Sequence, residues 1–192
     1  MLFTVLCIMC NASLQSGKLL ASQKHATVLP GIKKPTLDEA GLNSYRPISN
    51  PSFVSKLVER VVDYQYVEHA EQNYLFPARQ SAYRHQHSRE TAVVSLVSDL
   101  VRAVDNGKVS ALVLLDLSSA FDTVDHGSLL TVLDDRFAVT GPALDWFRSY
   151  LSEQTQTIIV GGTESQTVSM DCNVPQGSVL GPLEFISYTD EV

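Results

Sequence analysis

The stretch that decides the fold reads ALVLLDLSSAFDTVDH and spans residues 111–126. It opens with five consecutive apolar residues, a pattern typical of a strand buried on both faces. Asp116 ends that run. A carboxylate at the end of a buried strand is held rigidly at the rim of the sheet, a suitable place for a hard cation such as Mg²⁺. The residues alone leave a second interpretation open, in which Asp116 caps the next helix and the acids beyond it are solvated.

Apolar periodicity predicts the elements around this stretch. Residues 52–73 and 91–104 repeat apolar side chains at intervals of three and four, which predicts two amphipathic helices. Shorter patterns predict helices at 128–137 and 143–151 and a hairpin near 157–170, and the Gly and Pro content of 33–47 predicts an exposed hairpin or loop. We expect an α+β fold in which residues 111–115 form a central strand with the two long helices packed beside it.

Composition limits the chain to one compact domain or part of a larger one, because it has 192 residues, of which 44% are hydrophobic. The net charge of −7 is unevenly placed. Residues 1–110 hold 12 basic and 9 acidic side chains, whereas residues 111–192 hold 2 basic and 12 acidic ones. The first part can therefore meet phosphates, and the second part needs cations.

Three cysteines, two of them inside an apolar run, suit a reducing compartment better than a disulfide framework. The apolar stretch Leu2–Cys10 is too short to span a bilayer and has no basic region before it. We therefore expect an intracellular protein of the nucleus or cytoplasm, not secreted and not bound to a membrane.

A second feature, VPQGSVLGP at residues 174–182, lies about sixty residues after Asp116. Its glycines allow another backbone or a nucleotide to approach closely, and Gln176 adds a neutral hydrogen-bonding side chain. An ordinary Pro-Gly turn would explain the same residues.

Taken together and in this order, the two strings resemble motifs A and B of reverse transcriptases. Their residues are similar to those of vertebrate non-LTR (LINE-type) retrotransposons. Further short sequence motifs that resemble that family follow one another along nearly the whole chain: YRPIS at 45–49, QSAYR at 80–84, HSRETA at 87–92, DWFRSYL at 145–151 and GPL at 181–183. The resemblance implies a right-hand polymerase with an antiparallel palm sheet packed on helices. Residues 1–110 would form the fingers and the start of the palm, and residues 111–192 the palm with motifs A and B.

The resemblance also implies chemistry. Reverse transcriptases join deoxynucleotides to a DNA primer on an RNA template, with two Mg²⁺ or Mn²⁺ ions held by palm aspartates. Asp116 would be the first metal ligand, with the backbone carbonyl of Leu117 beside it. Phe121 stands where the family places the steric gate against a 2′ hydroxyl, although it could equally be a core aromatic.

The remaining family positions concern the nucleotide and the template. Gln176 and Gly177 correspond to the motif B pair that lines the nucleotide pocket. Arg46, with Lys33 or Lys34, corresponds to the fingers cations that hold triphosphate oxygens. Arg84 would bind nucleic acid through the template backbone, or else would pair with a structural carboxylate.

Two departures from the family pattern limit these expectations. The 192 residues contain no aromatic-Ala-Asp-Asp string, the motif C that carries the remaining catalytic aspartate, and YTDE at 188–191 follows Gln176 too closely to replace it. We therefore expect a chain truncated before motif C and inactive alone, since one carboxylate cannot position both ions. The alternative is a non-catalytic nucleic-acid-binding or decayed protein derived from a retroelement. Glu184 also stands where the family has an apolar residue.

Overall fold

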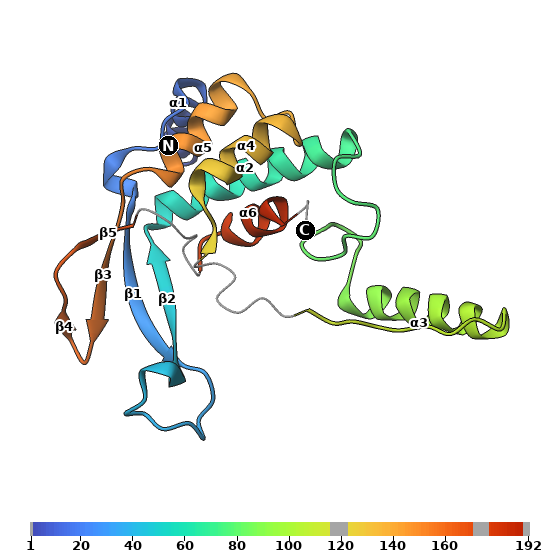
Figure 1. The fold of residues 1–192 in the computed structure, drawn as a ribbon. Coiled ribbons are helices and arrows are strands. Elements are labelled where there is room, and N and C mark those ends of the chain that lie inside the picture. The colour runs from blue at the N-terminus through green and yellow to red at the C-terminus, as the bar shows by residue number, and fades with distance from the viewer. Residues whose placement is uncertain (1, 116–122, 171–176, 190–192) are drawn as a thin grey trace.

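The structure is a computed structural model that describes residues 2–115, 123–170 and 177–189. Its helices are α1 (Leu2–Ser16), α2 (Phe53–Gln72), α3 (Arg89–Asp105), α4 (His126–Asp135), α5 (Gly141–Leu151) and α6 (Gly181–Tyr188), with 3₁₀ turns at Ala21–Gln23 and Leu42–Ser44. Its strands are β1 (His25–Ile32), β2 (Tyr45–Pro51), β3 (Gln154–Val160), β4 (Thr163–Glu164) and β5 (Val168–Met170). The sheet projects from one side of a layer of helices, and α3 stands apart from both (Figure 1).

The helical layer is built along α2. The side chain of Ser52 caps this helix by accepting a hydrogen bond from Ser55 N at 3.1 Å. Val58, Val62 and Tyr66 recur every four residues and form part of its buried face. The Tyr66 ring centroid lies 6.0 Å from that of Phe147 on α5, within the range of favourable edge-to-face contact. The helices predicted at 52–73, 128–137 and 143–151 are confirmed, with ends that differ by at most two residues.

The sheet is mixed, so the prediction of an antiparallel sheet is wrong. Its order is β2-β1-β3-β4, and β5 also pairs with β3. β1 and β2 form an antiparallel hairpin, whereas β1 and β3 run parallel over His25–Val28. A parallel pair needs a long crossover, and the segment from β2 through α5 supplies it. The predicted hairpin near 157–170 is confirmed, with Gly161 and Gly162 both at positive φ in the tight turn between β3 and β4.

Residues 111–115, expected as the central strand, lie outside the sheet. They have no regular secondary structure and are exposed, with Leu115 at 85%. A strand exists only where a neighbour takes up its backbone hydrogen bonds, and no described strand lies against this run. The central positions of the sheet belong instead to β1 and β3.

The helix predicted at 91–104 is confirmed as α3, but its expected packing beside the sheet is wrong. A capping box between Ser88 and Thr91 starts the helix, which explains why local sequence is sufficient to form it. None of its residues is buried, and Val94, Val97 and Val101 are all at least half exposed.

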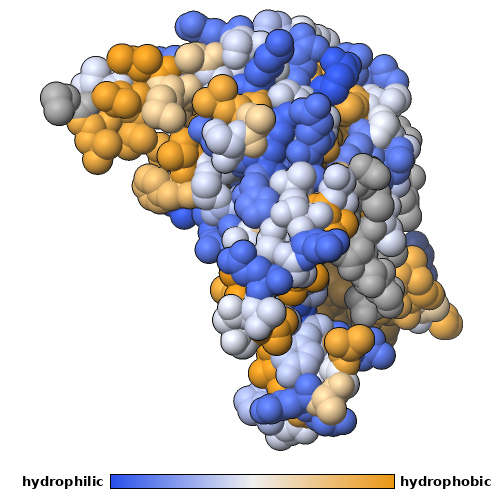
Figure 2. Space-filling model, turned by 90° about the vertical axis from the view of Figure 1, so that its left-hand side faces the viewer, coloured by the Kyte–Doolittle hydropathy of each residue, from blue (hydrophilic) through white to orange (hydrophobic). Residues whose placement is uncertain are grey.

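The free end of α1 carries a further apolar surface. Figure 2 shows hydrophobic side chains gathered there. Leu2, Phe3 and Ile8 are exposed by 74%, 79% and 62%. Within the described part of the chain, no helix has both the length and the apolar content to cross a membrane.

Candidate functional site

The β1–β2 hairpin presents the cations that the sequence assigns to phosphate binding. Arg46 lies on β2 opposite Gly31, and Lys33 and Lys34 follow the end of β1. All three side chains are exposed. Lys33 Nζ donates to Asn43 O at 2.9 Å, which ties it to the loop that closes the hairpin. No described carboxylate pairs with any of the three, so their charge is available to an anion.

Gly177 connects the second motif to this hairpin. Its φ is +113°, a backbone conformation that only glycine adopts at low cost. A Cβ at this position would lie 2.5 Å from the carbonyl oxygen of Ser49 on β2, so no other residue fits without a shift of backbone. Ser49 is three residues from Arg46 along β2, roughly 10 Å at the rise of a strand. The fold therefore brings residue 177 to the strand that carries Arg46.

Four of the predicted site residues, Asp116, Leu117, Phe121 and Gln176, lie outside the described residues, and their roles stay predictions. Asp125, the last acid of the motif A string, is described. Its Oδ1 accepts from Ser128 N at 2.7 Å and caps α4, and this hydrogen bond is the main cause of its lowered pKa. Within 2–115, 123–170 and 177–189, no three His, Cys, Asp or Glu side chains converge as metal ligands.

Arg84 forms hydrogen bonds with other residues of the chain. Its Nε and Nη2 atoms donate to the two carboxylate oxygens of Glu71, both at 2.8 Å, in a bidentate pair. Its Nη1 atom also donates to the backbone carbonyls of Pro77 and Gln80. The guanidinium carbon lies 5.4 Å from the ring centroid of Phe76. The hydrogen bond from Arg84 is the main cause of the lowered pKa of Glu71. Arg84 thus pairs with a carboxylate that belongs to the fold, and its binding to nucleic acid stays a prediction.

Sequence reasoning missed an acidic centre inside the helical layer. Glu59 on α2 and Glu184 on α6 are each 1% exposed. Burial, and then the charge of Glu59, raise the pKa of Glu184 to about 8. Burial also raises the pKa of Tyr150 on α5, with further contributions from both acids. A signal was present in the sequence, since Glu59 falls between Ser55 and Val62 on the apolar face of the predicted helix.

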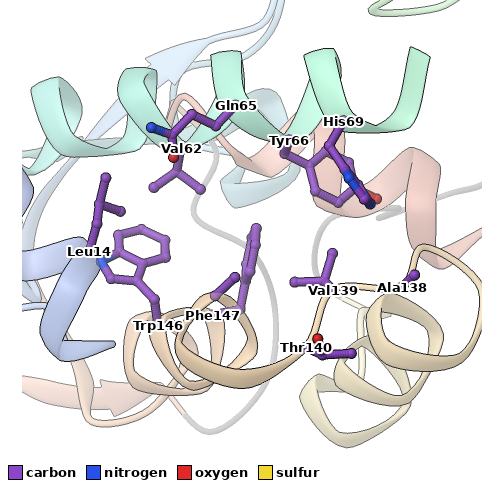
Figure 3. A pocket seen from close by; sticks show the side chains of 11 residues that line it. Leu14, Val62, Gln65, Tyr66, His69, Ala138, Val139, Thr140, Trp146 and Phe147 are labelled. Atoms are coloured by element: carbon purple, nitrogen blue, oxygen red, sulfur yellow. The ribbon is translucent and has the colours of Figure 1, made fainter. Parts of the chain in front are cut away.

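A cavity of about 240 Å³ lies elsewhere, between α2 and α5 (Figure 3). Tyr66, Trp146 and Phe147 provide much of its lining. His69 borders it, but one ring nitrogen of His69 is hydrogen-bonded to Phe137 O at 2.8 Å. No acidic or cationic side chain of the predicted site is among the residues that line this cavity.

Comparison with known proteins agrees with the order of motifs. Residues 32–192 match the family of reverse transcriptases (RNA-dependent DNA polymerases). The chain is 32% identical over 187 residues to the probable RNA-directed DNA polymerase from transposon BS of Drosophila melanogaster, a match that covers 97% of this chain and 20% of that protein. It is 28% identical over 188 residues to the RNA-directed DNA polymerase from mobile element jockey of Drosophila melanogaster, again over 97% and 20%.

A third relative is the retrovirus-related Pol polyprotein from type-1 retrotransposable element R2 of Popillia japonica, 29% identical over 153 residues, which are 78% of this chain and 20% of that protein. The chain thus spans about a fifth of the length of the curated relatives it matches. The family match includes the β2 strand, the Asp116 string and the Gly177 turn, and it covers far more than half of the sequence. This chain belongs to the reverse transcriptase family.

Proposed function

We propose that the chain is part of the RNA-directed DNA polymerase of a vertebrate LINE-type, non-LTR retrotransposon. Its substrates would be an RNA template, a DNA primer and deoxynucleoside triphosphates, and it would act in the nucleus or cytoplasm. The observation that carries the proposal is the contact of Gly177 with Ser49. It joins the motif B turn to the cationic β1–β2 hairpin, although the two segments are far apart in sequence.

Each residue has a separate task in this proposal. Arg46, Lys33 and Lys34 hold triphosphate oxygens, which suits three exposed cations on one hairpin. Gly177 and Gln176 line the base and sugar side of the pocket, and Phe121 packs under the sugar.

Reverse transcriptases in general use divalent metal ions, and Asp116 with the Leu117 carbonyl would hold Mg²⁺ or Mn²⁺ here. When bound, the metal polarises the phosphoryl oxygens. The described residues do not by themselves supply a metal site.

A second function, non-catalytic binding of nucleic acid, is favoured by the same exposed cations. Binding that rests on three phosphate contacts should weaken by about 40-fold between 50 and 200 mM salt. Fluorescence anisotropy of a labelled RNA–DNA hybrid measures this slope. Replacement of Lys33, Lys34 and Arg46 by alanine is expected to abolish the slope, and an unchanged slope would show that the hairpin does not bind phosphates.

Primer extension separates the two functions. The assay uses poly(rA) with an oligo(dT) primer and Mg²⁺, and compares the 192-residue chain with a chimera in which the chain replaces the matching fifth of the transposon BS polymerase. The chain alone is expected to give no extension, because it holds no aromatic-Ala-Asp-Asp string. The chimera is expected to extend the primer, and Asp116→Ala to reduce extension to background.

The matched control is Asp134→Ala, which removes an exposed acid of α4 and should leave extension unchanged. Extension that persists in the Asp116→Ala chimera would contradict the assignment of the metal ligand. A chimera that binds the hybrid but extends nothing would favour the non-catalytic function.

A further inference from the structure

Glu59 makes contacts that reach from α2 to the start of α6. Its Oε2 accepts hydrogen bonds from the backbone nitrogens of Val179 at 2.7 Å and Leu180 at 3.4 Å. Its Oε1 accepts from Ser55 Oγ at 3.1 Å, one helical turn earlier on α2. A buried carboxylate is costly unless donors satisfy it, and these three donors do so.

The segment that Glu59 holds is the turn of residues 177–180, between the motif B glycine and α6. Leu180, at the N-cap position of α6, makes no side-chain capping hydrogen bond, so the N–H groups at the start of the helix need other acceptors. Ser178 Oγ accepts one of them, Gly181 N, at 2.9 Å. Glu59 accepts the N–H groups of Val179 and Leu180, which precede the helix, and Gly177 at the other end of the turn lies close to the backbone of Ser49. The turn is thus fixed from α2 on one side and from β2 on the other.

We infer that Glu59 is a positioning residue, whose buried carboxylate holds the 177–180 turn against β2. The consequence of this contact for the nucleotide rests on the proposed function. If the 177–180 turn lines the nucleotide pocket, Glu59 sets the position of Gly177 without touching the substrate.

The neighbouring acid, Glu184, differs from Glu59 in its hydrogen bonds. Within the described part of the chain, neither oxygen of Glu184 has a hydrogen-bond partner, whereas Glu59 accepts three hydrogen bonds. Hydrogen bonds from donors favour the ionised form, and burial without donors favours the neutral form. The third group at this centre, Tyr150, has a raised pKa and stays neutral. Glu59 is therefore the carboxyl group of the pair whose oxygens the turn satisfies.

Amide hydrogen exchange on the full 192-residue chain tests the contact. Loss of charge-assisted hydrogen bonds should speed exchange at Val179 and Leu180 by about fivefold in Glu59→Gln, which keeps an acceptor oxygen, and by about thirtyfold in Glu59→Leu. Exchange in β1 should stay unchanged. Glu68→Gln, an exposed glutamate of the same helix, is the matched control and should leave both regions unchanged.

A second readout follows the Glu184 carboxyl carbon by NMR during a pH titration. Burial, and then the charge of Glu59, raise the pKa of Glu184. The titration midpoint should therefore fall in Glu59→Gln and stay in place in Glu68→Gln. A purely steric role of Glu59 would not move this midpoint. If Glu59→Leu does not fold, both amide exchange and the Glu184 titration can still be measured on Glu59→Gln.

Unchanged exchange at Val179 and Leu180 in folded Glu59→Gln, or an unmoved midpoint, would overturn the inference. Binding of Mg²⁺·dTTP by the same proteins addresses the nucleotide separately, and weaker binding by Glu59→Gln than by Glu68→Gln is expected. A wild-type chain that binds no dTTP would count against the proposed pocket, while amide exchange would still decide whether Glu59 holds the turn.

Discussion

Glu184→Leu should stabilise the protein, and the gain should grow with pH. Glu184 is 1% exposed, neither of its oxygens has a hydrogen-bond partner within the described residues, and Glu59 lies near it. Leucine would fill the same site with apolar atoms. The substitution therefore removes a buried group that is unfavourable whenever it ionises.

The pKa of Glu184 determines how large the gain in stability from Glu184→Leu is and in which direction it changes with pH. Folding raises it from 4.5 to about 8, so the folded state binds the proton more tightly than the unfolded state does. Between these two pH values the unfolded chain holds fewer protons at this group, and wild-type stability falls as pH rises. Relative to the wild type, the gain from Glu184→Leu should be about 1 kcal/mol at pH 5 and about 4 kcal/mol at pH 8.

Urea unfolding followed by circular dichroism at pH 5 and pH 8 measures this difference of about 3 kcal/mol. Glu184→Gln, which is isosteric but cannot ionise, should also lose the pH dependence, and Glu68→Gln should keep that of the wild type. Equal gains at both pH values would refute the reasoning, because they would show that Glu184 ionises as easily in the folded protein as in the unfolded chain.

Two substitutions test other parts of the fold by the same unfolding measurement. Gly177→Ala should cost about 3 kcal/mol, because its Cβ would meet Ser49 O at 2.5 Å, whereas Gly107→Ala, with positive φ but open space, should cost about 1 kcal/mol; equal costs would exclude the close approach. Arg84→Lys should cost about 2 kcal/mol, since lysine cannot form the bidentate pair with Glu71. If it instead leaves stability unchanged and weakens binding to an RNA–DNA hybrid, Arg84 contacts the template.

Local signals in the sequence were sufficient for the helices. Ser52 and Ser88 cap α2 and α3 with their own side chains, and both helices begin within two residues of the predicted start. Capping and periodicity depend on residues within one or two turns, so they can be read without knowledge of the fold. The tight turn at Gly161-Gly162 was predictable for the same reason.

Strand partners were not predictable in this way. The apolar run at 111–115 indicates that these side chains favour burial, but its residues do not specify which strand would pair with them. The parallel pairing of β1 with β3 depends on the packing of the whole segment between them, and no motif within either strand encodes it. The predicted antiparallel sheet, its central strand at 111–115 and the packing of α3 beside it were therefore the parts of the fold on which the sequence prediction was wrong.

The same distinction applies to the site. The family resemblance leads to Gly177 and Arg46, because each belongs to a contiguous motif, and it leads to Lys33 and Lys34 as the fingers cations that precede Arg46. Glu59 belongs to no such motif, and its partners Val179 and Leu180 are 120 residues further along the chain. Its role follows only from the hydrogen bonds that the fold creates. A charged residue on the apolar face of a predicted helix is a signal for such a role, because burial without a distant partner would destabilise the fold.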